Sequence, residues 1–278
     1  MSMGAAEPTK SGEADPGRRD VRLFRFADLL PRSGRGVAGA LPPGQRAISS
    51  FPRYGAHFAR PDPPVPARPL IEVAGATIAT VKLDAAALQS LPRVDLTAGF
   101  HCVAGWTARG LHWEGVRLRD IYETVLAREP AAARAISHIR AVGRDGWRAV
   151  LVLEDALADD VLIADRLDGA PLPIEHGGPF RLVSASQYGY KSVKHLCRME
   201  LHAGEPSDAP ARLLNRIQLK AVAMHPRARV LHEERSRALP SWSVRWISRV
   251  IHPPGYILGY LGALRTRRKI ARNAEGAE

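Results

Sequence analysis

The sequence is poor in cysteine, and this excludes several classes of small or metal-stapled protein. Only two of its 278 residues are cysteine, and neither belongs to a CxxC or CxxCH pair. Two cysteines cannot form the framework of a disulfide-stapled secreted domain, and the missing pairs argue against a zinc ribbon and against c-type haem attachment. With 45% hydrophobic residues, the chain must fold by ordinary apolar burial, as one large domain or two.

Long apolar runs are also lacking. A membrane-spanning helix needs about 20 consecutive apolar residues, whereas the uncharged stretch 250–264 carries a histidine and two prolines at residues 252–254. The arginine pair at residues 18–19 is followed by further charged residues instead of the apolar segment of an export signal. We therefore expect a cytoplasmic protein.

Charge is distributed unevenly along the chain. Lys and Arg number 40 and Asp and Glu 28, a net charge of +12. Residues 209–278 hold 14 basic and 4 acidic side chains, so ten of the twelve excess positive charges lie there. A basic segment of this kind indicates contact with anionic lipid, nucleic acid or an acidic partner, whereas the nearly neutral remainder needs a separate interpretation.

The composition divides the chain into three parts. Residues 1–44 form an N-terminal extension whose glycine- and proline-rich composition predicts partial disorder. Residues 45–205 carry most of the strand and helix patterns and form the body. Residues 206–278 form the basic C-terminal extension.

Short apolar segments predict strands in the body, with few and short helices between them. The expected strands are 70–73, 78–81, 94–100, 136–142, 147–153, 163–167, 180–184 and 193–201, and the expected helices are 83–91, 116–127 and 154–158. Strands and helices do not alternate regularly, as they would in a doubly wound sheet. The pattern therefore predicts a mixed α+β fold.

Cys102 is the residue most open to a chemical interpretation, because it follows an expected strand and adjoins His101. A free cysteine is most often a buried packing residue. A zinc site with His101 and His112 would lack a fourth ligand, and neighbouring strand residues point to opposite faces, which also weakens a nucleophilic Cys–His pair. These alternatives stay open on the residues alone.

Four segments that occur in order narrow the choice: HCVAGW, HWEGVRLRDI, GAPLPIEHGGPFRLV and YGYKSVKHL. Together they resemble the molybdopterin-binding domain of the sulfite oxidase family over about residues 45–205. The resemblance implies a sulfite-oxidase-like fold of several short mixed sheets with surrounding helices. It also implies a molybdopterin cofactor carrying molybdenum, with Cys102 as the protein ligand to the metal. A soft thiolate suits that role.

The resemblance carries further site residues onto this chain. In HGGPFR, His176 and Arg181 would contact the cofactor, and a guanidinium can bind phosphate oxygens through two parallel hydrogen bonds. In YGYKSVK, the contacts would come from Ser192, the backbone of Val193 and Lys194.

Two shorter matches add candidates. SFPRYG would bring Arg53 and Tyr54 to the cofactor or to the open side of the metal, and the turn at 143–146 would bring Asp145. An aspartate in a turn more often caps its own backbone. His101, Arg53 and Arg109 are candidates to attract an anionic substrate, and we assign His101 and Arg53 with Cys102 to the catalytic group.

The C-terminal extension has its own pattern. Aromatic and aliphatic residues alternate with arginines over 239–264, and RTRRK follows. This is typical of an amphipathic segment at an anionic membrane surface, and equally of a tail that packs on the body with solvated arginines. No nucleic-acid-reading motif accompanies the charge, so nucleic-acid binding is not expected.

The sequence thus predicts a molybdopterin-dependent oxidoreductase. It would transfer an oxygen atom to or from a small substrate in a two-electron reaction and exchange electrons singly with an unidentified carrier. The alternative is a binding or scaffold protein, with or without the cofactor, that docks on anionic membrane through its basic tail.

Overall fold

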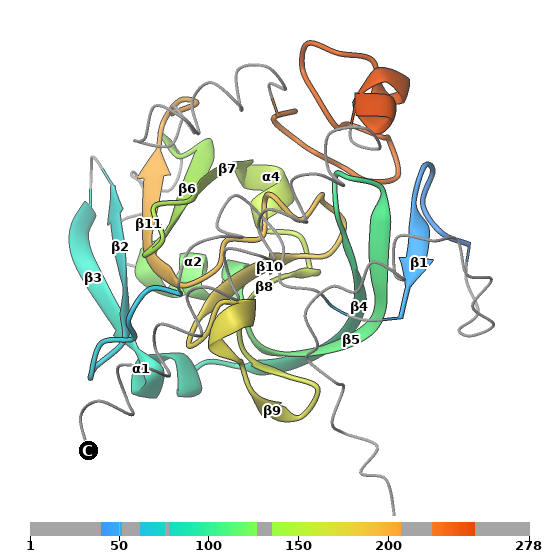
Figure 1. Ribbon diagram of the computed structural model, residues 1–278. Coiled ribbons are helices and arrows are strands. Elements are labelled where there is room, and N and C mark those ends of the chain that lie inside the picture. The colour runs from blue at the N-terminus through green and yellow to red at the C-terminus, as the bar shows by residue number, and fades with distance from the viewer. Residues whose placement is uncertain are drawn as a thin grey trace, which may run out of the picture.

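Two mixed β-sheets form the body of the protein (Figure 1). The structure is a computed structural model, and it describes residues 40–49, 51, 62–75, 78–126, 135–206 and 224–247. The predicted mixture of strands with a few short helices is confirmed.

The larger sheet has six strands. They are β1 (Arg46–Ile48), β4 (Arg93–His101), β5 (Trp106–Arg117), β8 (Val161–Leu167), β9 (Ala170–Pro171) and β10 (Arg181–Ser184). The order is β1-β5-β8-β10, with β4 added on β5 and β9 on β8. Only β1 and β5 pair in parallel; the other pairs are antiparallel.

The second sheet has five strands in the order β3-β2-β11-β6-β7. They are β2 (Leu70–Gly75), β3 (Ile78–Asp84), β6 (His138–Gly143), β7 (Arg148–Val152) and β11 (Leu196–His202). The hairpin of β2 and β3 and the pair β6–β7 agree with the sequence pattern, whereas β11 lies parallel to β2 and antiparallel to β6.

The helices of the body are short: α1 (Ala85–Gln89), α2 (Leu118–Leu126), α4 (Leu153–Ala156) and a 3₁₀ turn at Ile174–His176. The Asp84 side chain caps α1 by accepting a hydrogen bond of 2.9 Å from the N–H of Ala87, which satisfies a donor otherwise left free at a helix start. No helix within the described residues is long and apolar enough to cross a bilayer.

The second expected helix begins later than its pattern indicated. The sequence placed a helix over 116–127, but β5 runs through Arg117 and α2 begins only at Leu118. Val116 and Leu118 are both buried, and their spacing fits either the end of a strand or the start of a helix. Val116 belongs to the strand because it pairs with β4 on one side and with β8 on the other.

The last strand also begins later than expected. The pattern indicated 193–201, yet β11 starts at Leu196. Val193 is buried in a loop, and His195 has a φ of +50°, a conformation that a regular strand cannot contain.

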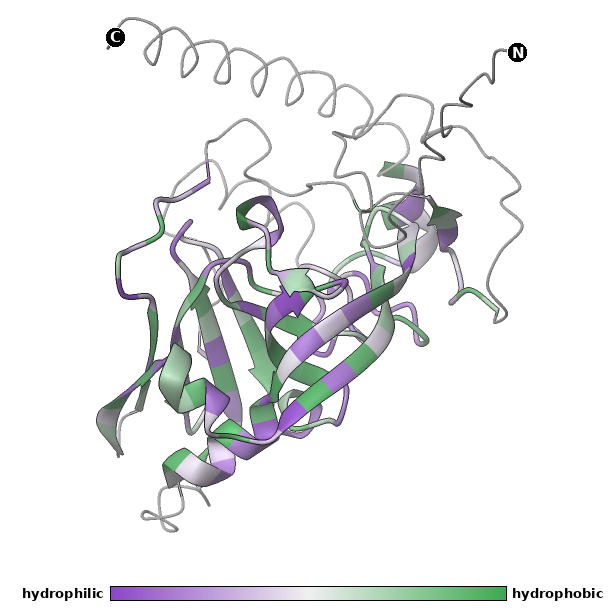
Figure 2. Cartoon of the chain, turned by 90° about the horizontal axis from the view of Figure 1, so that it is seen from below, coloured by the Kyte–Doolittle hydropathy of each residue, from purple (hydrophilic) through white to green (hydrophobic). Residues whose placement is uncertain are grey.

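The larger sheet is covered by apolar side chains on both faces. Along β8, Val161 and Ile163 belong to the core shared with the second sheet, while Leu162 and Ala164 belong to a separate cluster on the opposite face. This alternation follows from the two-residue period of a strand, and Figure 2 shows similar striping of hydropathy along the long strands. The separate cluster contains Cys102.

We predict that Gly115→Ala destabilises the fold, because a Cβ at this position in β5 would lie 2.1 Å from the carbonyl oxygen of Ile163 on β8. Overpacking against backbone should lower the free energy of unfolding by about 2 kcal/mol or more. Urea denaturation measures the loss. Gly204→Ala is the matched control, because a Cβ there meets no atom within 4 Å. Equal stability of the two variants would contradict the β5–β8 register.

Candidate functional site

Cys102 lies in a tight turn between β4 and β5. Its N–H donates a 2.8 Å hydrogen bond to the carbonyl of Trp106, and its own carbonyl accepts one of 2.9 Å from the N–H of Gly105. Gly105 has a φ of +90°, which favours glycine. The turn therefore holds the cysteine backbone on both sides.

The Cys102 side chain is only 4% exposed and packs in the apolar cluster with Trp106 and Trp113. Burial raises the pKa of its thiol to about 12, although a backbone hydrogen bond at Ala104 and the charge of Arg235 act in the opposite direction. A thiol with this pKa is protonated at neutral pH and is a poor nucleophile by itself.

The His101 ring makes its hydrogen bond with Thr107 and not with the Cys102 thiol. Its Nδ1 lies 2.9 Å from the Thr107 hydroxyl, which donates to the Gln45 amide oxygen at 3.0 Å. Since the hydroxyl proton goes to Gln45, Nδ1 of His101 carries the donated proton and Nε2 is the acceptor. Burial lowers the pKa of His101 to about 4, so the ring is neutral. These contacts do not form the Cys–His pair considered from the sequence.

The zinc alternative also fails in the part of the chain that the structure describes. No group of three or more His, Cys, Asp or Glu side chains there is arranged to hold a metal ion. His112, the third ligand considered, is half-exposed and lies 3.3 Å from the Asp95 carboxylate.

Arg181 is the most unusual charged residue near Cys102. It is 1% exposed, and its guanidinium carbon lies 4.8 Å from the ring centre of Phe100, 5.4 Å from Trp113 and 5.5 Å from Phe51. Nη1 donates a 2.8 Å hydrogen bond to the His176 carbonyl, but Nε has no hydrogen-bond partner within the described residues.

Burial lowers the pKa of Arg181 to about 9. A desolvated cation is costly unless an anion or strong acceptors compensate it. Aromatic ring faces supply only a small part of that compensation. An anionic ligand bound at Arg181 would therefore offset much of the cost of burying its charge.

His176 joins this group through its ring. It stacks on Phe51 with the ring centres 4.4 Å apart and the planes 9° from parallel. Phe51 in turn contacts Phe100 at 5.1 Å and the edge of Trp113 at 5.8 Å. The structure thus gathers His176, Arg181 and the aromatic residues of β4 and β5 in one place.

The loop at 188–195 closes against the same group. The N–H of Gly189 donates a 2.7 Å hydrogen bond to the carbonyl of His101, one residue before Cys102. A Cβ at Gly189 would lie 2.2 Å from the Phe100 ring, so only glycine permits this approach. The cysteine turn and the YGYKSVK segment are therefore neighbours in the structure.

Three predicted cofactor residues are held within this loop. Ser192 is buried, and its hydroxyl accepts a 3.1 Å hydrogen bond from the N–H of Ser184. The Val193 carbonyl accepts from the N–H of Leu182. Lys194 donates from Nζ to the carbonyl of Glu175 at 2.8 Å.

Glycine at 177 connects the loop to the HGG turn. Gly177 has a φ of +106°, and a Cβ there would lie 2.8 Å from Cα of Lys194. His195 donates its N–H to the Gly177 carbonyl at 2.9 Å. These contacts keep His176 and Lys194, which are 18 positions apart, on neighbouring segments.

Of the remaining predicted residues, Asp145 lies in the turn between β6 and β7. The Asp145 carboxylate accepts a 2.9 Å hydrogen bond from the N–H of Trp147 and so caps the turn between β6 and β7. That turn nevertheless lies beside the loop, since a Cβ at Gly143 would be 2.4 Å from the Lys194 carbonyl. Arg53 and Tyr54 lie outside the described residues.

Sequence reasoning missed Arg235, which lies against the cysteine turn. It is completely buried, donates from Nη1 to the carbonyl of Val103 and from Nη2 to that of Gly44 at 3.2 Å, and stacks over the Tyr188 ring at 4.8 Å. Its position in a segment interpreted as a basic tail gave no signal of burial.

Comparison with known proteins assigns the chain to a family. A family model described as "Oxidoreductase molybdopterin binding domain" matches residues 61–210. Over 166 residues the chain is 31% identical to "Uncharacterized oxidoreductase YuiH" of Bacillus subtilis, covering 57% of this chain and 77% of that protein.

Other similarities are more partial. The chain is 27% identical over 153 residues to "Protein-methionine-sulfoxide reductase catalytic subunit MsrP" of Gluconobacter oxydans, covering 49% of this chain and 47% of that protein, so it spans about half the length of that relative. Among solved structures, "Sulfane Dehydrogenase SoxCD" from Paracoccus pantotrophus aligns with a TM-score of 0.45 at 19% identity, covering 71% of this chain and 56% of that one.

We predict that the two cysteines differ in reactivity. In the native protein at pH 8, a thiol reagent such as 5,5′-dithiobis(2-nitrobenzoate) should modify at most the half-buried Cys197, because Cys102 is buried with a pKa of about 12. Unfolding in guanidinium should release both thiols. Cys102→Ser should remove one thiol only from the unfolded count; rapid modification of Cys102 in the native protein would contradict the described burial.

Proposed function

The chain belongs to the oxidoreductase molybdopterin-binding domain family, and from this premise we propose that it transfers an oxygen atom to or from a small substrate, with Cys102 as the protein ligand to molybdenum. The observation that carries the proposal is a buried Arg181 whose Nε has no hydrogen-bond partner in the part of the chain that the structure describes, packed against the same aromatic side chains as a buried free cysteine.

The residues of this group fit an anionic pterin cofactor. Arg181 can offer its free Nε–H and the remaining donors of the guanidinium to phosphate oxygens, and a buried anion would offset the cost of its desolvation. Ser192, the backbone of Val193 and Lys194 would complete the anion contacts from the neighbouring loop. His176, stacked on Phe51, would contact the same group.

Cys102 fits the metal in chemical type. Its sulfur is the soft donor that such a metal accepts, and coordination would displace the thiol proton that burial otherwise retains. Molybdenum bound there would supply the two-electron redox change and the oxygen-atom transfer. The surrounding aromatic side chains would exclude bulk water from the reacting groups.

The reaction requires both protons and electrons. Removing an oxygen atom from a substrate consumes two electrons and two protons and releases water, and oxidation of a substrate runs the same balance in reverse. An unidentified one-electron carrier would deliver or accept the electrons in two steps. Neutral His101 can accept a hydrogen bond at Nε2, and Arg53 and Arg109 would attract an anionic substrate.

The relatives suggest which substrates to test first. The protein from Gluconobacter oxydans is named for reduction of methionine sulfoxide, in which oxygen leaves sulfur. Methionine sulfoxide as oxygen donor and sulfite as oxygen acceptor therefore test the two directions. Activity in neither direction, with no molybdenum bound, would instead favour the binding or scaffold protein considered from the sequence.

Metal analysis tests the ligand assignment. We predict about one molybdenum per chain in the native protein and at least a tenfold lower molybdenum content, or loss of all turnover, in Cys102→Ser, because an alcohol oxygen is a poorer soft-metal ligand. Cys197→Ser is the matched control and should keep both metal and activity, since the Cys197 thiol lies on β11 and donates a 3.5 Å hydrogen bond to the Val142 carbonyl. Full activity of Cys102→Ser with metal bound would refute the assignment.

Replacing the buried arginine should separate stability from cofactor binding. Arg181→Met removes a desolvated cation, so we expect the free energy of unfolding of the cofactor-free protein to change by no more than about 1 kcal/mol or to rise. Cofactor retention, measured by pterin fluorescence after oxidation, should fall at least tenfold.

The control for this variant is Arg198→Met. Arg198 lies on β11 of the second sheet, where its half-exposed side chain pairs with Glu200 of the same strand. It should leave cofactor content unchanged. If Arg181→Met unfolds the protein, or if it retains the cofactor as well as Arg198→Met does, then Arg181 serves packing and the proposed anion contact is wrong.

A further inference from the structure

The turn that carries Cys102 is held by two segments that lie outside the family match. The match covers residues 61–210, whereas residues 43–48 precede it and residues 224–247 follow it. Figure 1 draws β1 beside β5 and the C-terminal segment over the end of the β4–β5 hairpin, where the turn lies. Membership of the family therefore does not by itself account for what surrounds the proposed metal ligand.

The N-terminal segment holds two carbonyl groups of the turn. Gln45 donates from Nε2 to the Cys102 carbonyl at 3.2 Å, and the N–H of Arg46 donates to the Gly105 carbonyl at 3.0 Å. β1 then continues in parallel beside β5, with Arg46 opposite Trp106. These contacts fix the backbone at both ends of the turn.

Arg235 holds the carbonyl between them. Its Nη1 donates to the Val103 carbonyl, and its Nη2 donates to the Gly44 carbonyl at 3.2 Å. One guanidinium thus joins the turn to the residue that precedes Gln45. Buried backbone carbonyls need a donor, and three carbonyls of this turn receive theirs from the two flanking segments.

The position of Arg235 is costly for stability. The side chain is completely buried, burial lowers its pKa, and its Nε has no hydrogen-bond partner within the described residues. The Glu233 carboxylate lies 3.8 Å away and also pairs with Arg245. An apolar residue often replaces a buried charge without loss of stability, so the guanidinium needs a reason other than packing.

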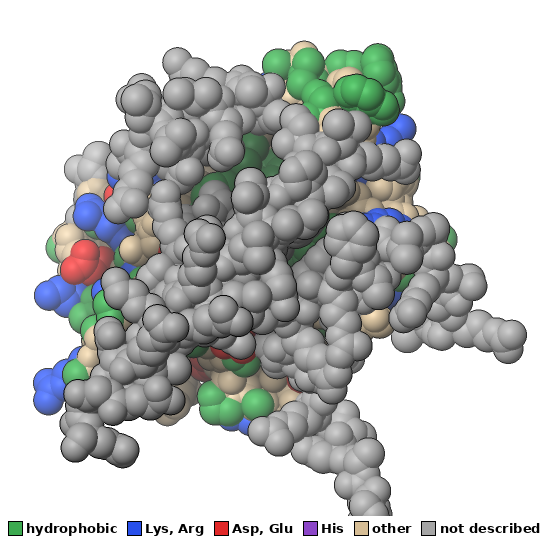
Figure 3. Space-filling view, in the orientation of Figure 1, with side chains coloured by type: hydrophobic (Ala, Val, Ile, Leu, Met, Phe, Trp, Pro, Cys, Tyr) green, Lys and Arg blue, Asp and Glu red, His purple; other side chains and the backbone are tan. Residues whose placement is uncertain are grey.

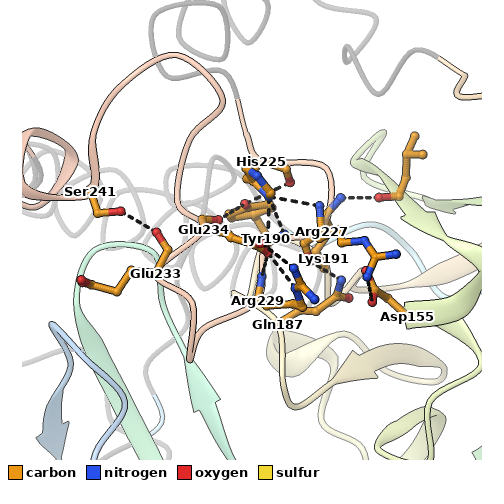
Figure 4. A network of polar contacts seen from close by, with 12 residues as sticks. Asp155, Gln187, Tyr190, Lys191, His225, Arg227, Arg229, Glu233, Glu234 and Ser241 are labelled. Atoms are coloured by element: carbon orange, nitrogen blue, oxygen red, sulfur yellow. Dashed lines mark hydrogen bonds and ion pairs between the residues drawn. The ribbon is translucent and has the colours of Figure 1, made fainter.

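Anchoring of the C-terminal segment does not supply that reason, because other contacts already fix the segment to the body (Figure 4). Arg227 pairs with Glu154 and Asp155 of α4. The N–H of Val230 donates to the Ser186 carbonyl at 2.9 Å. The segment is therefore attached at points that do not involve the buried guanidinium.

The outer end of the segment has a different environment. Its short helix at residues 241–247 lies at a corner of the molecule where Figure 3 shows hydrophobic side chains at the surface. Trp242 and Trp246 on this helix are exposed at 67% and 64%, whereas Arg235 is at 0%. The guanidinium therefore belongs to the inner side of the segment, against the cysteine turn.

We propose that Arg235 and Gln45 are positioning residues that hold the Cys102 turn in one conformation, so that its sulfur is presented to the metal in a fixed direction. This inference rests on the proposed role of Cys102 as the metal ligand. A ligand that is already held loses less conformational freedom on binding, and contacts around a metal ligand orient it and tune the metal. Both residues act on the backbone of the turn.

Thiol reactivity tests the proposal on the full chain. In a Cys197→Ser background Cys102 is the remaining cysteine, and in cofactor-free protein it should react slowly with 5,5′-dithiobis(2-nitrobenzoate) because it is buried. Arg235→Met should accelerate this reaction at least about tenfold, since two carbonyls lose their donor and the turn opens locally. Arg235→Lys keeps a donor and should give an intermediate rate.

The matched control is Arg119→Met. The Arg119 Nε also donates to a backbone carbonyl, that of Leu157 at 2.9 Å, but on α2 and away from the turn; its loss should leave the Cys102 rate unchanged. If Arg235→Met does not fold, Gln45→Met at a half-buried position removes the donor to the Cys102 carbonyl and should accelerate the reaction at least about threefold.

Light absorption reads the turn in the molybdenum-loaded protein. A thiolate bound to a metal absorbs visible light by charge transfer, at an energy that depends on the direction of the sulfur–metal bond. This band should shift in Arg235→Met and Gln45→Met and stay in place in Arg119→Met. A general loss of stability would not shift it.

Two results would overturn the proposal: Cys102 reacts as slowly in Arg235→Met and Gln45→Met as in the background protein, or Arg119→Met accelerates the reaction equally. An unshifted absorption band in loaded variants would also refute positioning while leaving Cys102 as the ligand. Failure of the proposed function looks different, because the background protein would then bind no molybdenum even though the variants expose Cys102.

Discussion

A single buried cation determines how the region around Cys102 is built. Arg181 begins β10, a strand buried on both faces, so within the described residues its guanidinium has the rings of Phe51, Phe100 and Trp113 and one hydrogen bond to the His176 carbonyl in place of water. For stability alone this position is costly, because an apolar residue of similar volume often packs in place of a buried charge at no loss of stability. The cost is understandable if the strand must present a charge to a ligand, and a family of molybdopterin-binding proteins has such a ligand.

The two-sided burial of the larger sheet explains why residues far apart in sequence meet. One face of β8 and β10 packs on the second sheet, and the other face packs on the cluster that contains Cys102. Glycine then allows the loops to close: Gly189 approaches the Phe100 ring, and Gly177 approaches Lys194. The strands fix where each segment ends, and the glycines remove the Cβ atoms that would otherwise hold the segments apart.

The sequence predicted those parts of the fold and site whose signals are local. The hairpin of β2 and β3, the capped helix α1 and the ordered motifs around Cys102, His176 and Lys194 all depend on neighbouring residues. The start of α2 was wrong because apolar spacing at Val116 and Leu118 suits a strand end and a helix start equally, and only pairing across the sheet distinguishes them. Burial of Arg235 likewise depends on contacts more than 100 positions away, which no local pattern encodes.

Arg235 shows that the C-terminal segment is part of the structure around Cys102. Its guanidinium holds the carbonyls of Val103 and Gly44, and its charge acts on the neighbouring thiol in the direction that favours a thiolate. Because a carboxylate at Glu233 lies 3.8 Å away and is shared with Arg245, part of the Arg235 charge is compensated within the segment itself. Residues 224–247 and the turn that carries Cys102 are thus in direct contact, although more than 100 positions separate Arg235 from Val103.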